Sequence, residues 1–362
     1  MDYVALSEKI FRELCVIPAP SGKEEKRAEY CLNKLKEFGI EGYIDKAKNV
    51  IYLLEGEKED ITVFQAHTDV VFPDEETLPF SEDEENIYCP GCGDDTIEVA
   101  LLLGVIKKIT DEKIKPKNSV LFVLNSCEEG LGNLKGTREI FASYGNRIKE
   151  LYTFDGQTSH VVNKSVGSHR YKVTVKTTGG HSYNDFGNEN AARVLAEAIQ
   201  LIYQIKVPEK DTTTYNVGVI SGGTSVNTII QQAEMLCEYR SDNFENLAFM
   251  KNEFKKVFDY ISTLADVTVE LVGDRPCGNN LDEEKMRAMT EFACAVQEKH
   301  GKCKVKVESG STDCNIPHSL GAPAVCVGAY LGGGAHTREE WLKKDSFALG
   351  FAITEEIVKS CF

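Results

Sequence analysis

The sequence lacks the segments that mark membrane-spanning and secreted proteins. It has no run of about 18 consecutive apolar residues, the length that a membrane-spanning helix needs. The chain also opens without the basic, apolar and small-residue regions of a signal peptide. Internal repeats and low-complexity segments are absent as well. We therefore expect a cytoplasmic protein that has no membrane partner.

Positive charge is scarce. Lys and Arg number 41 against 57 Asp and Glu, which leaves a net charge of −16 at pH 7. Nucleic acids and anionic membranes select basic surfaces, so we expect no nucleic-acid partner. An acidic surface favours solubility, and it also suits a site that gathers carboxylates around cations. The 362 residues, 42% of them hydrophobic, predict a globular protein of about two domains.

Clustered cysteine ligands are also missing. The chain has 12 cysteines, but only Cys89 and Cys92 form a close pair, and no second pair completes a zinc site. In a reducing compartment most of these cysteines should be free thiols. A redox protein built on Cys89 and Cys92 is an alternative, and it predicts that alkylation of a thiol abolishes activity.

Residues 1–165 alternate between helical and strand patterns. Two helices are expected within residues 1–40, and another follows Asp95. The strands that we expect lie near residues 41–46, 50–54, 61–67, 119–124 and 151–154. The acidic residues 74–88 lack apolar periodicity and predict a surface loop. Alternation of helices and strands predicts an α/β fold with a doubly wound mixed sheet.

The pattern changes after about residue 165. Strict alternation in Tyr171–Thr177 predicts a half-exposed antiparallel strand. The order β-α-β-β-α-β then predicts a ferredoxin-like α+β domain inserted at residues 166–273. The first domain, residues 1–165, resumes at residues 274–362. Its last helix is expected at 339–360, with Trp341 in the packing of that helix.

The segment Ile61–Val71 (ITVFQAHTDVV) places polar side chains at the end of an apolar strand. Ligands of open α/β sheets bind at the carboxyl ends of the strands. His67 offers an imidazole to a divalent metal ion, and Asp69 projects from the same face and can hold the ring. The alternative is a polar turn with an inert, hydrogen-bonded histidine.

Acidic residues recur at the ends of later elements. Asp94 and Asp95 precede a helix, Glu128 and Glu129 follow a buried strand, and Asp155 follows another strand. An aspartate before a helix is commonly an N-cap, but a second one leaves a carboxylate that can bridge two metal ions. Adjacent carboxylates on an extended backbone point different ways, so one can bind a metal ion while the other reaches water. A surface acidic turn is the alternative.

An ordered set of segments carries a resemblance to a known family. The segments are HTDV, GDD, EEG, FDG, GGHSYNDFG, SGGTSVNTI followed by Glu234 and Arg240, and GGGAHTREEW. Together they resemble the M20 metallopeptidases, which include peptidase T, carboxypeptidase G, succinyl-diaminopimelate desuccinylase and acetylornithine deacetylase. The resemblance implies a zinc-peptidase-like catalytic domain with an inserted lid or dimerisation domain. The chain departs from the family pattern at Thr96-Ile97, where many relatives have Lys-Gly.

The resemblance implies a centre of two divalent metal ions that share one aspartate. The implied ligands are His67, Asp94 and Asp155 for one ion, and Asp94, Glu129 and His336 for the other. Glu128 is the implied general base, and Asp69 the residue that orients His67. Two such cations polarise the scissile carbonyl and lower the pKa of a shared water from about 15.7 towards neutrality. Zinc is expected, although Mn²⁺ and Co²⁺ suit the same ligands.

Four further residues match substrate-facing positions of the family. The resemblance makes His181 a stabiliser of the oxyanion, often across a dimer, and Asn227 a substrate-binding amide. Arg240 matches an arginine that grips a substrate carboxylate, a task that suits a bidentate guanidinium. In the loop Ser309–Asp313, the backbone of Gly310 can approach a ligand closely. The alternatives are a loop histidine, a turn asparagine and a surface arginine.

We expect a dizinc hydrolase that cleaves the amide bond of a small peptide. In the family, aspartate at the position of Asp155 resembles the aminopeptidase and dipeptidase branch, which favours an aminopeptidase for di- or tripeptides. An N-acyl amino acid deacylase of the same family is the alternative. A catalytically silent peptide-binding relative is an alternative of another class. We also expect a homodimer through the inserted domain, which a monomeric mass at micromolar concentration would contradict.

Overall fold

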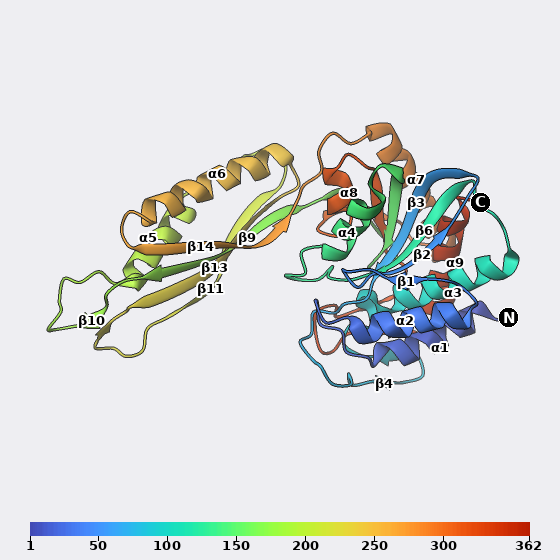
Figure 1. Ribbon diagram of the computed structural model, residues 1–362, viewed down its shortest axis with the longest axis horizontal. Helices are drawn as coiled ribbons and strands as arrows, with labels where there is room; N and C mark the ends of the chain where they lie inside the picture. The colour runs from blue at the N-terminus through green and yellow to red at the C-terminus, as the bar shows by residue number, and fades with distance from the viewer. The chain divides into compact units, whose positions relative to one another are not determined.

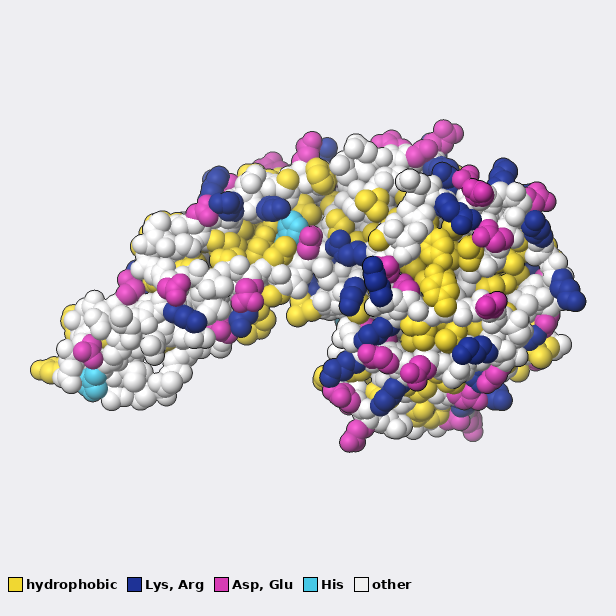
Figure 2. Space-filling model, in the orientation of Figure 1, with side chains coloured by type: hydrophobic (Ala, Val, Ile, Leu, Met, Phe, Trp, Pro, Cys, Tyr) yellow, Lys and Arg dark blue, Asp and Glu magenta, His cyan; other side chains and the backbone are white.

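The computed structural model describes residues 1–362, which form two compact units. We call residues 1–165 with 279–362 the first unit, and residues 166–278 the inserted unit. None of the helices combines the length and the apolar character that a membrane crossing requires. Figure 2 shows acidic and basic side chains intermingled over the visible face of the protein.

An eight-stranded mixed sheet forms the centre of the first unit (Figure 1). Its strands, in spatial order, are β1 (Tyr43–Ile44), β2 (Val50–Leu54), β6 (Asn118–Asn125), β3 (Lys58–His67), β7 (Ile148–Phe154), β16 (Ala324–Val327), β8 (His160–Ser165) and β15 (Lys306–Gly310). β3 runs parallel to both β6 and β7, whereas β16 runs parallel to β7 and antiparallel to β8. The predicted doubly wound mixed sheet is therefore confirmed.

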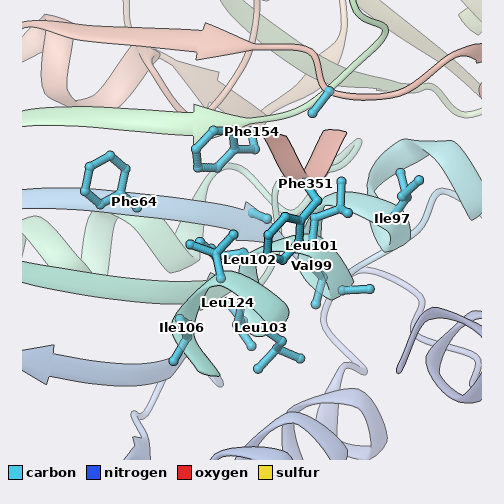
Figure 3. Close-up of a cluster of buried hydrophobic side chains, with 14 of the residues drawn as sticks. Phe64, Ile97, Val99, Leu101, Leu102, Leu103, Ile106, Leu124, Phe154 and Phe351 are labelled. Carbon is cyan, nitrogen blue, oxygen red and sulfur yellow. The ribbon is translucent and has the colours of Figure 1, made fainter. Parts of the chain in front are cut away.

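Helices cover both faces of this sheet. One face is covered by α1 (Tyr3–Cys15), α2 (Glu25–Glu37), α3 (Ile97–Glu112), α7 (Glu283–Gly301) and α9 (Ser346–Lys359), and the other by α4 (Lys135–Tyr144) and α8 (Asn315–Ser319). Adjacent residues of a strand pack into the hydrophobic cores on opposite faces of the sheet. In β3, Phe64 lies in the core beneath α1, α2, α3, α7 and α9, and Val63 lies in the core beneath α4 and α8. Leu101, Leu102 and Leu103 of α3 are all fully buried (Figure 3). The first ten residues of α3, from Ile97 to Ile106, are all buried, as expected of a helix segment that lies inside a protein.

His318 of α8 is a buried histidine that the structure holds in its neutral form. Its Nε2–H donates to the carbonyl oxygen of Ala324 at 2.8 Å, because a carbonyl can only accept. Its Nδ1 therefore accepts from the hydroxyl group of Ser165 at 2.6 Å. Burial lowers the pKa of His318 from its ordinary value of 6.5 to about 4.

This histidine should make the stability of the protein sensitive to mild acid. The unfolded chain binds the proton near pH 6.5 and the folded chain only near pH 4, so protonation favours unfolding as the pH falls through this interval. We expect His318 to lower the free energy of unfolding by about 3 kcal/mol between pH 7 and pH 4. Urea unfolding of the wild type and of His318→Gln, which keeps a donor for Ala324, measures the difference. Equal pH dependence of the two proteins would contradict this assignment.

The inserted unit is a ferredoxin-like sandwich, as its sequence pattern predicts. Its elements are β9 (Gly167–Lys176), α5 (Ala191–Ile202), β11 (Thr213–Gly222), β13 (Gln232–Ser241), α6 (Phe244–Ile261) and β14 (Asp266–Arg275). The strands pair antiparallel in the order β11-β13-β9-β14. The two helices cover one face, where Val173, Met235 and Phe254 are buried. The other face carries ion pairs such as that between Lys172 and Glu234.

Two local predictions are wrong. Residues 74–88 are not only a loop, because β4 (Ser81–Glu82) and β5 (Asn86–Tyr88) lie within them. These strands form a small sheet with β17 (Gly332–Gly333) and β18 (Trp341–Lys343), in the order β17-β18-β5-β4. The last helix begins at Ser346, later than predicted. Trp341 does not lie on that helix but on β18, where it pairs with Tyr88 of β5.

Candidate metal centre

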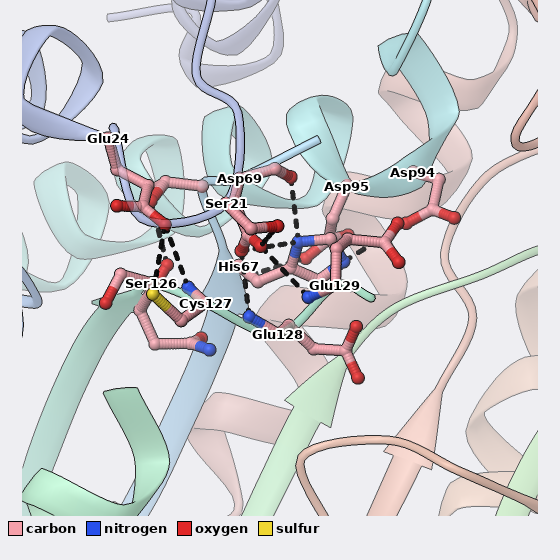
Figure 4. Close-up of polar contacts among 12 residues, drawn as sticks. Ser21, Glu24, His67, Asp69, Asp94, Asp95, Ser126, Cys127, Glu128 and Glu129 are labelled. Carbon is pink, nitrogen blue, oxygen red and sulfur yellow. Dashed lines mark hydrogen bonds and ion pairs between the residues drawn. The ribbon is translucent and has the colours of Figure 1, made fainter. Parts of the chain in front are cut away.

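Most of the predicted site residues of the first unit come together where neighbouring strands end. β3 ends at His67, β6 is followed by the turn that carries Glu128 and Glu129, and β7 is followed by Asp155. Because β3 lies parallel between β6 and β7, their carboxyl ends share one edge of the sheet. Figure 4 shows His67 and the two glutamates grouped at this edge.

Three groups of side chains could each hold a metal ion: one is His67, Glu128 and Glu129, and the other two include Asp94. His67, Asp94 and Asp155 form one of these two, and Asp94, Glu129 and His336 form the other; within each, the ligand atoms lie within 4.8 Å of one another. Oδ1 of Asp94 lies 3.1 Å from Nε2 of His67, and Oδ2 lies 3.0 Å from Nε2 of His336. The two oxygens of Asp94 thus face different histidines, which is the arrangement that a bridging ligand needs.

The electrostatics of these groups fit cations. Hydrogen bonds to Asp94 and Glu129 raise the pKa of His336 to about 11. Burial raises the pKa of Asp155 to about 7. Burial alone would lower the pKa of His67, but the neighbouring aspartates raise it well above its ordinary value. Carboxylates outnumber imidazoles, so the groups favour added positive charge, and their oxygen and nitrogen donors suit Zn²⁺, Mn²⁺ or Co²⁺.

Asp69 has a broader role than orienting His67. Nδ1 of His67 donates to the carbonyl oxygen of Asp69 at 3.1 Å, which leaves Nε2 without a proton in the neutral ring. The fully buried carboxylate of Asp69 accepts from the backbone N–H groups of Glu128 at 3.0 Å and Glu129 at 2.9 Å. It also accepts from the hydroxyl group of Ser21 at 2.6 Å (Figure 4). Asp69 therefore fixes the turn that carries both glutamates.

The aspartates before α3 are not N-caps. The N-cap residue of α3 is Thr96, and its side chain makes no capping hydrogen bond. Asp95 instead accepts from the backbone N–H of His67 at 2.7 Å. The backbone N–H of Asp94 donates to Glu340 at 2.8 Å. These contacts join β3, the Asp94–Asp95 segment and the segment that follows His336.

Ser21 and Glu340 are two residues near the centre that sequence reasoning missed. Ser21 lies in the turn before α2, 48 residues from the Asp69 carboxylate that it contacts. Glu340 follows His336 by four residues. An acidic residue in the same motif as a predicted metal ligand was the one feature of the sequence that could have pointed to it. Neither contact can be derived from local sequence pattern, because both join segments that are distant in the chain.

The remaining predicted site residues lie in separate places. In the inserted unit, His181 of β10 (Gly180–His181) lies close to Asn227, since Ser182 N–H donates to the Asn227 carbonyl oxygen and β10 pairs with β12 (Thr228–Ile229). Arg240 lies near the carboxyl end of β13 and donates to Glu238 at 2.8 and 3.1 Å. Gly310 ends β15 of the first unit.

The cysteine pair lies in the interior of the first unit. Cys89 is 1% exposed and Cys92 is fully buried, and both are free thiols. Burial raises the pKa of the Cys92 thiol, which disfavours the reactive thiolate. These surroundings do not favour the redox alternative.

Comparison with known proteins identifies the family. The model of Peptidase family M20/M25/M40 matches residues 63–360, which include every predicted metal ligand. The chain belongs to this family. As an M20 hydrolase, it brings together in one centre residues that are spread along most of the matched region.

Several proteins of known sequence are similar to this M20 chain. It is 24% identical over 339 residues to the uncharacterized protein YqjE of Bacillus subtilis (strain 168), with 87% of each chain covered. It is 25% identical over 269 residues to the N-acetyldiaminopimelate deacetylase of the same organism, with 68% of this chain and 69% of the relative covered. Relatives of the M20 chain thus include a deacetylase.

Solved structures share the fold of the M20 chain. Aminopeptidase PepT of Bacillus cereus gives a TM-score of 0.76 at 20% identity, with 99% of this chain and 98% of that one covered. A tripeptidase of Staphylococcus aureus gives 0.78 at 22% identity with the same coverage. A Bacillus subtilis protein, described as a dinuclear metal-binding peptidase of the M20 family, gives 0.67 at 16% identity, with 99% of each chain covered. These likenesses establish the α/β fold.

Proposed function

We propose that the protein is a dinuclear-metal amidohydrolase that cleaves the peptide bond of small peptides, as a di- or tripeptide aminopeptidase. The observation that carries this proposal is the pair of three-residue groups that share Asp94. Aspartate at position 155, which resembles the aminopeptidase branch, supports the choice of a peptidase. The folds of an aminopeptidase and a tripeptidase are similar to this one, which agrees with it.

In the proposed mechanism, His67, Asp94 and Asp155 would hold one divalent cation, and Asp94, Glu129 and His336 would hold the other. Two cations there supply positive charge that polarises a carbonyl group and lowers the pKa of water. Zinc is the cation that we propose, with Mn²⁺ and Co²⁺ as substitutes.

Glu128 performs the proton transfers in this proposal. Its carboxylate takes a proton from water and passes it to the leaving nitrogen of the cleaved amide. Glu128 is 5% exposed and offers a donor atom within 4.8 Å of those of His67 and Glu129. Asp69 holds the backbone N–H of Glu128, which keeps the base in place during the reaction.

We assign substrate-facing roles to four further residues. Nδ1 of His181 accepts from the backbone N–H of Tyr183 at 3.2 Å, so the neutral ring carries its proton on Nε2 and can donate it to an oxyanion. Asn227 and the backbone of Gly310 would bind the substrate. Arg240 would exchange its contact with Glu238 for a substrate carboxylate.

The substrates and the assembly of the protein stay predictions. We propose a small peptide as substrate and a homodimer formed through the inserted unit. β11 is an edge strand of that unit, and an exposed strand edge is able to pair with a second copy. We expect no nucleic-acid or membrane partner and a cytoplasmic location.

N-acyl amino acid deacylation is the second candidate function. The sequence relative that is an N-acetyldiaminopimelate deacetylase supports it, because the alignment covers 68% of this chain. The two reactions use the same chemistry on an amide bond. They differ in whether the substrate presents a free or a blocked amino group.

A paired substrate panel distinguishes the candidates. Protein reconstituted with Zn²⁺, Mn²⁺ or Co²⁺ is given di- and tripeptides with free amino termini, and the same peptides N-acetylated. We expect release of the first residue from the free peptides, with kcat/KM at least about tenfold above that for acetate release from the blocked ones. The reverse preference would establish the deacylase. Two bound cations without turnover of either set would favour the silent peptide-binding relative.

A further inference from the structure

A buried carboxylate that supplies no metal ligand lies beside the centre. The side chain of Glu340 is fully buried. Its Oε2 accepts from the backbone N–H of Gly91 at 2.7 Å, and its Oε1 accepts from the N–H groups of Gly93 and Asp94, both at 2.8 Å. Three backbone donors therefore replace the water that this carboxylate loses on burial.

The backbone that donates these hydrogen bonds has little room to move. Gly91 has a left-handed φ of +74°, and a Cβ atom there would lie 2.4 Å from Cγ1 of Val70. A Cβ atom on Gly93 would lie 2.5 Å from the ring of Tyr330. Because glycine leaves this space to the backbone, successive N–H groups converge on one point, as they do in anion-binding loops. Here the bound anion is a side chain of the protein itself.

The contact joins two segments that supply metal ligands. Glu340 follows His336 by four residues, and Nε2 of His336 lies 3.0 Å from Oδ2 of Asp94. The segment 336–340 therefore contacts Asp94 twice, through the imidazole on its carboxylate and through Glu340 on its backbone N–H. Cys89 N–H adds a hydrogen bond to the carbonyl oxygen of Glu340 at 3.2 Å.

We propose that Glu340 is a positioning residue, which holds Asp94 at the distance from His336 that binding of the second cation requires. The inference rests on the proposed dinuclear centre. Without Glu340, three buried N–H groups would lose their acceptor, and the Asp94 segment would relax away from its present position. Residues that orient metal ligands in this way typically contribute about 10- to 100-fold to metal affinity.

The test is a titration of metal-free, full-length protein with Co²⁺, followed by visible absorption. Glu340→Gln keeps the shape of the side chain but turns an NH₂ group towards backbone donors. We expect wild type to bind about two ions, and the variant to bind the second ion about 10- to 100-fold more weakly with an altered Co²⁺ band. Glu339→Gln is the matched control, because the neighbouring Glu339 is exposed and loses the same charge. It should titrate as wild type does.

Each outcome bears on a different statement. Absence of Co²⁺ binding by wild type would overturn the metal centre itself. Equal affinities and spectra for wild type and Glu340→Gln would overturn the role of Glu340 alone, even if the variant unfolds at a lower temperature. Circular dichroism shows whether Glu340→Gln is folded. If Glu340→Gln is not folded, Glu340→Asp replaces it in the titration, since aspartate keeps the charge but is too short to reach all three N–H groups. Wild-type affinity of Glu340→Asp for the second ion would show that the role of Glu340 is purely structural. Loss of folding in both variants would show the same.

Discussion

Replacement of Glu128 by glutamine is expected to abolish peptide hydrolysis while both cations stay bound. Glutamine keeps the size of the side chain but cannot take a proton from water, and it contributes none of the implied metal ligands. A general base typically accounts for about 10² to 10⁴ of the rate, so we expect kcat to fall about 10³-fold with little change in KM. Steady-state kinetics on the best peptide of the panel and elemental analysis of bound metal measure the two effects.

A surface variant serves as the control for this change. Glu84 is exposed in the turn between β4 and β5, so Glu84→Gln removes the same charge at a site with no contact to the centre. It should keep wild-type kcat. Unchanged activity of Glu128→Gln would show that another group carries the proton. Loss of metal from that variant would instead show that Glu128 is a metal ligand. That outcome is possible because Glu128 forms a group of potential ligands with His67 and Glu129.

Replacement of Asp94 by asparagine should affect both cations at once. One carboxylate oxygen lies near His67 and the other near His336, and an amide offers only one oxygen to replace them. We expect bound metal to fall from about two ions per chain to about one or fewer. Hydrolysis should fall by at least about 10³-fold, because in the proposed mechanism both ions would act on the same amide bond. Elemental analysis after dialysis against a fixed concentration of free Zn²⁺ measures the first effect.

The neighbouring aspartate provides a matched control. Asp95 accepts from the backbone N–H of His67, and asparagine can still accept that hydrogen bond. Asp95→Asn should therefore retain about two ions per chain. If Asp94→Asn also retained two ions with wild-type affinity, Asp94 would not be the shared ligand, and the centre would need another bridge.

Local sequence pattern predicts much of this site because of a general property of parallel sheets. His67 ends an apolar strand, Asp155 directly follows another, and Glu128 and Glu129 lie in the turn after a third; parallel strands bring such positions to one edge. The prediction needs only the strands and their direction. Their order in the sheet adds that β3 lies between β6 and β7. The ferredoxin-like unit is predictable for a similar reason, since its helices and strands alternate in a clear local order.

The features that were missed depend on contacts between distant segments. β5 and β18 are each only three residues long, and a strand of that length has no pattern of its own until its partner is known. The same limit applies to Glu340, whose carboxylate binds amides nearly 250 positions earlier in the chain. The function of Asp69 as a support for Glu128 also follows only from the fold, because sequence pattern relates it to the nearby His67.

The position of β16 has a consequence for biosynthesis. β7 and β8 are close in sequence, yet β16 lies between them in the sheet, and it follows the whole inserted unit in the chain. As the ribosome delivers the chain, the edge of β7 that pairs with β16 has no partner until residues 324–327 emerge. His336 is translated later still. The first of the two groups that share Asp94 is therefore complete in the nascent chain well before the second. Both cations of the proposed centre can bind only after the inserted unit has been translated.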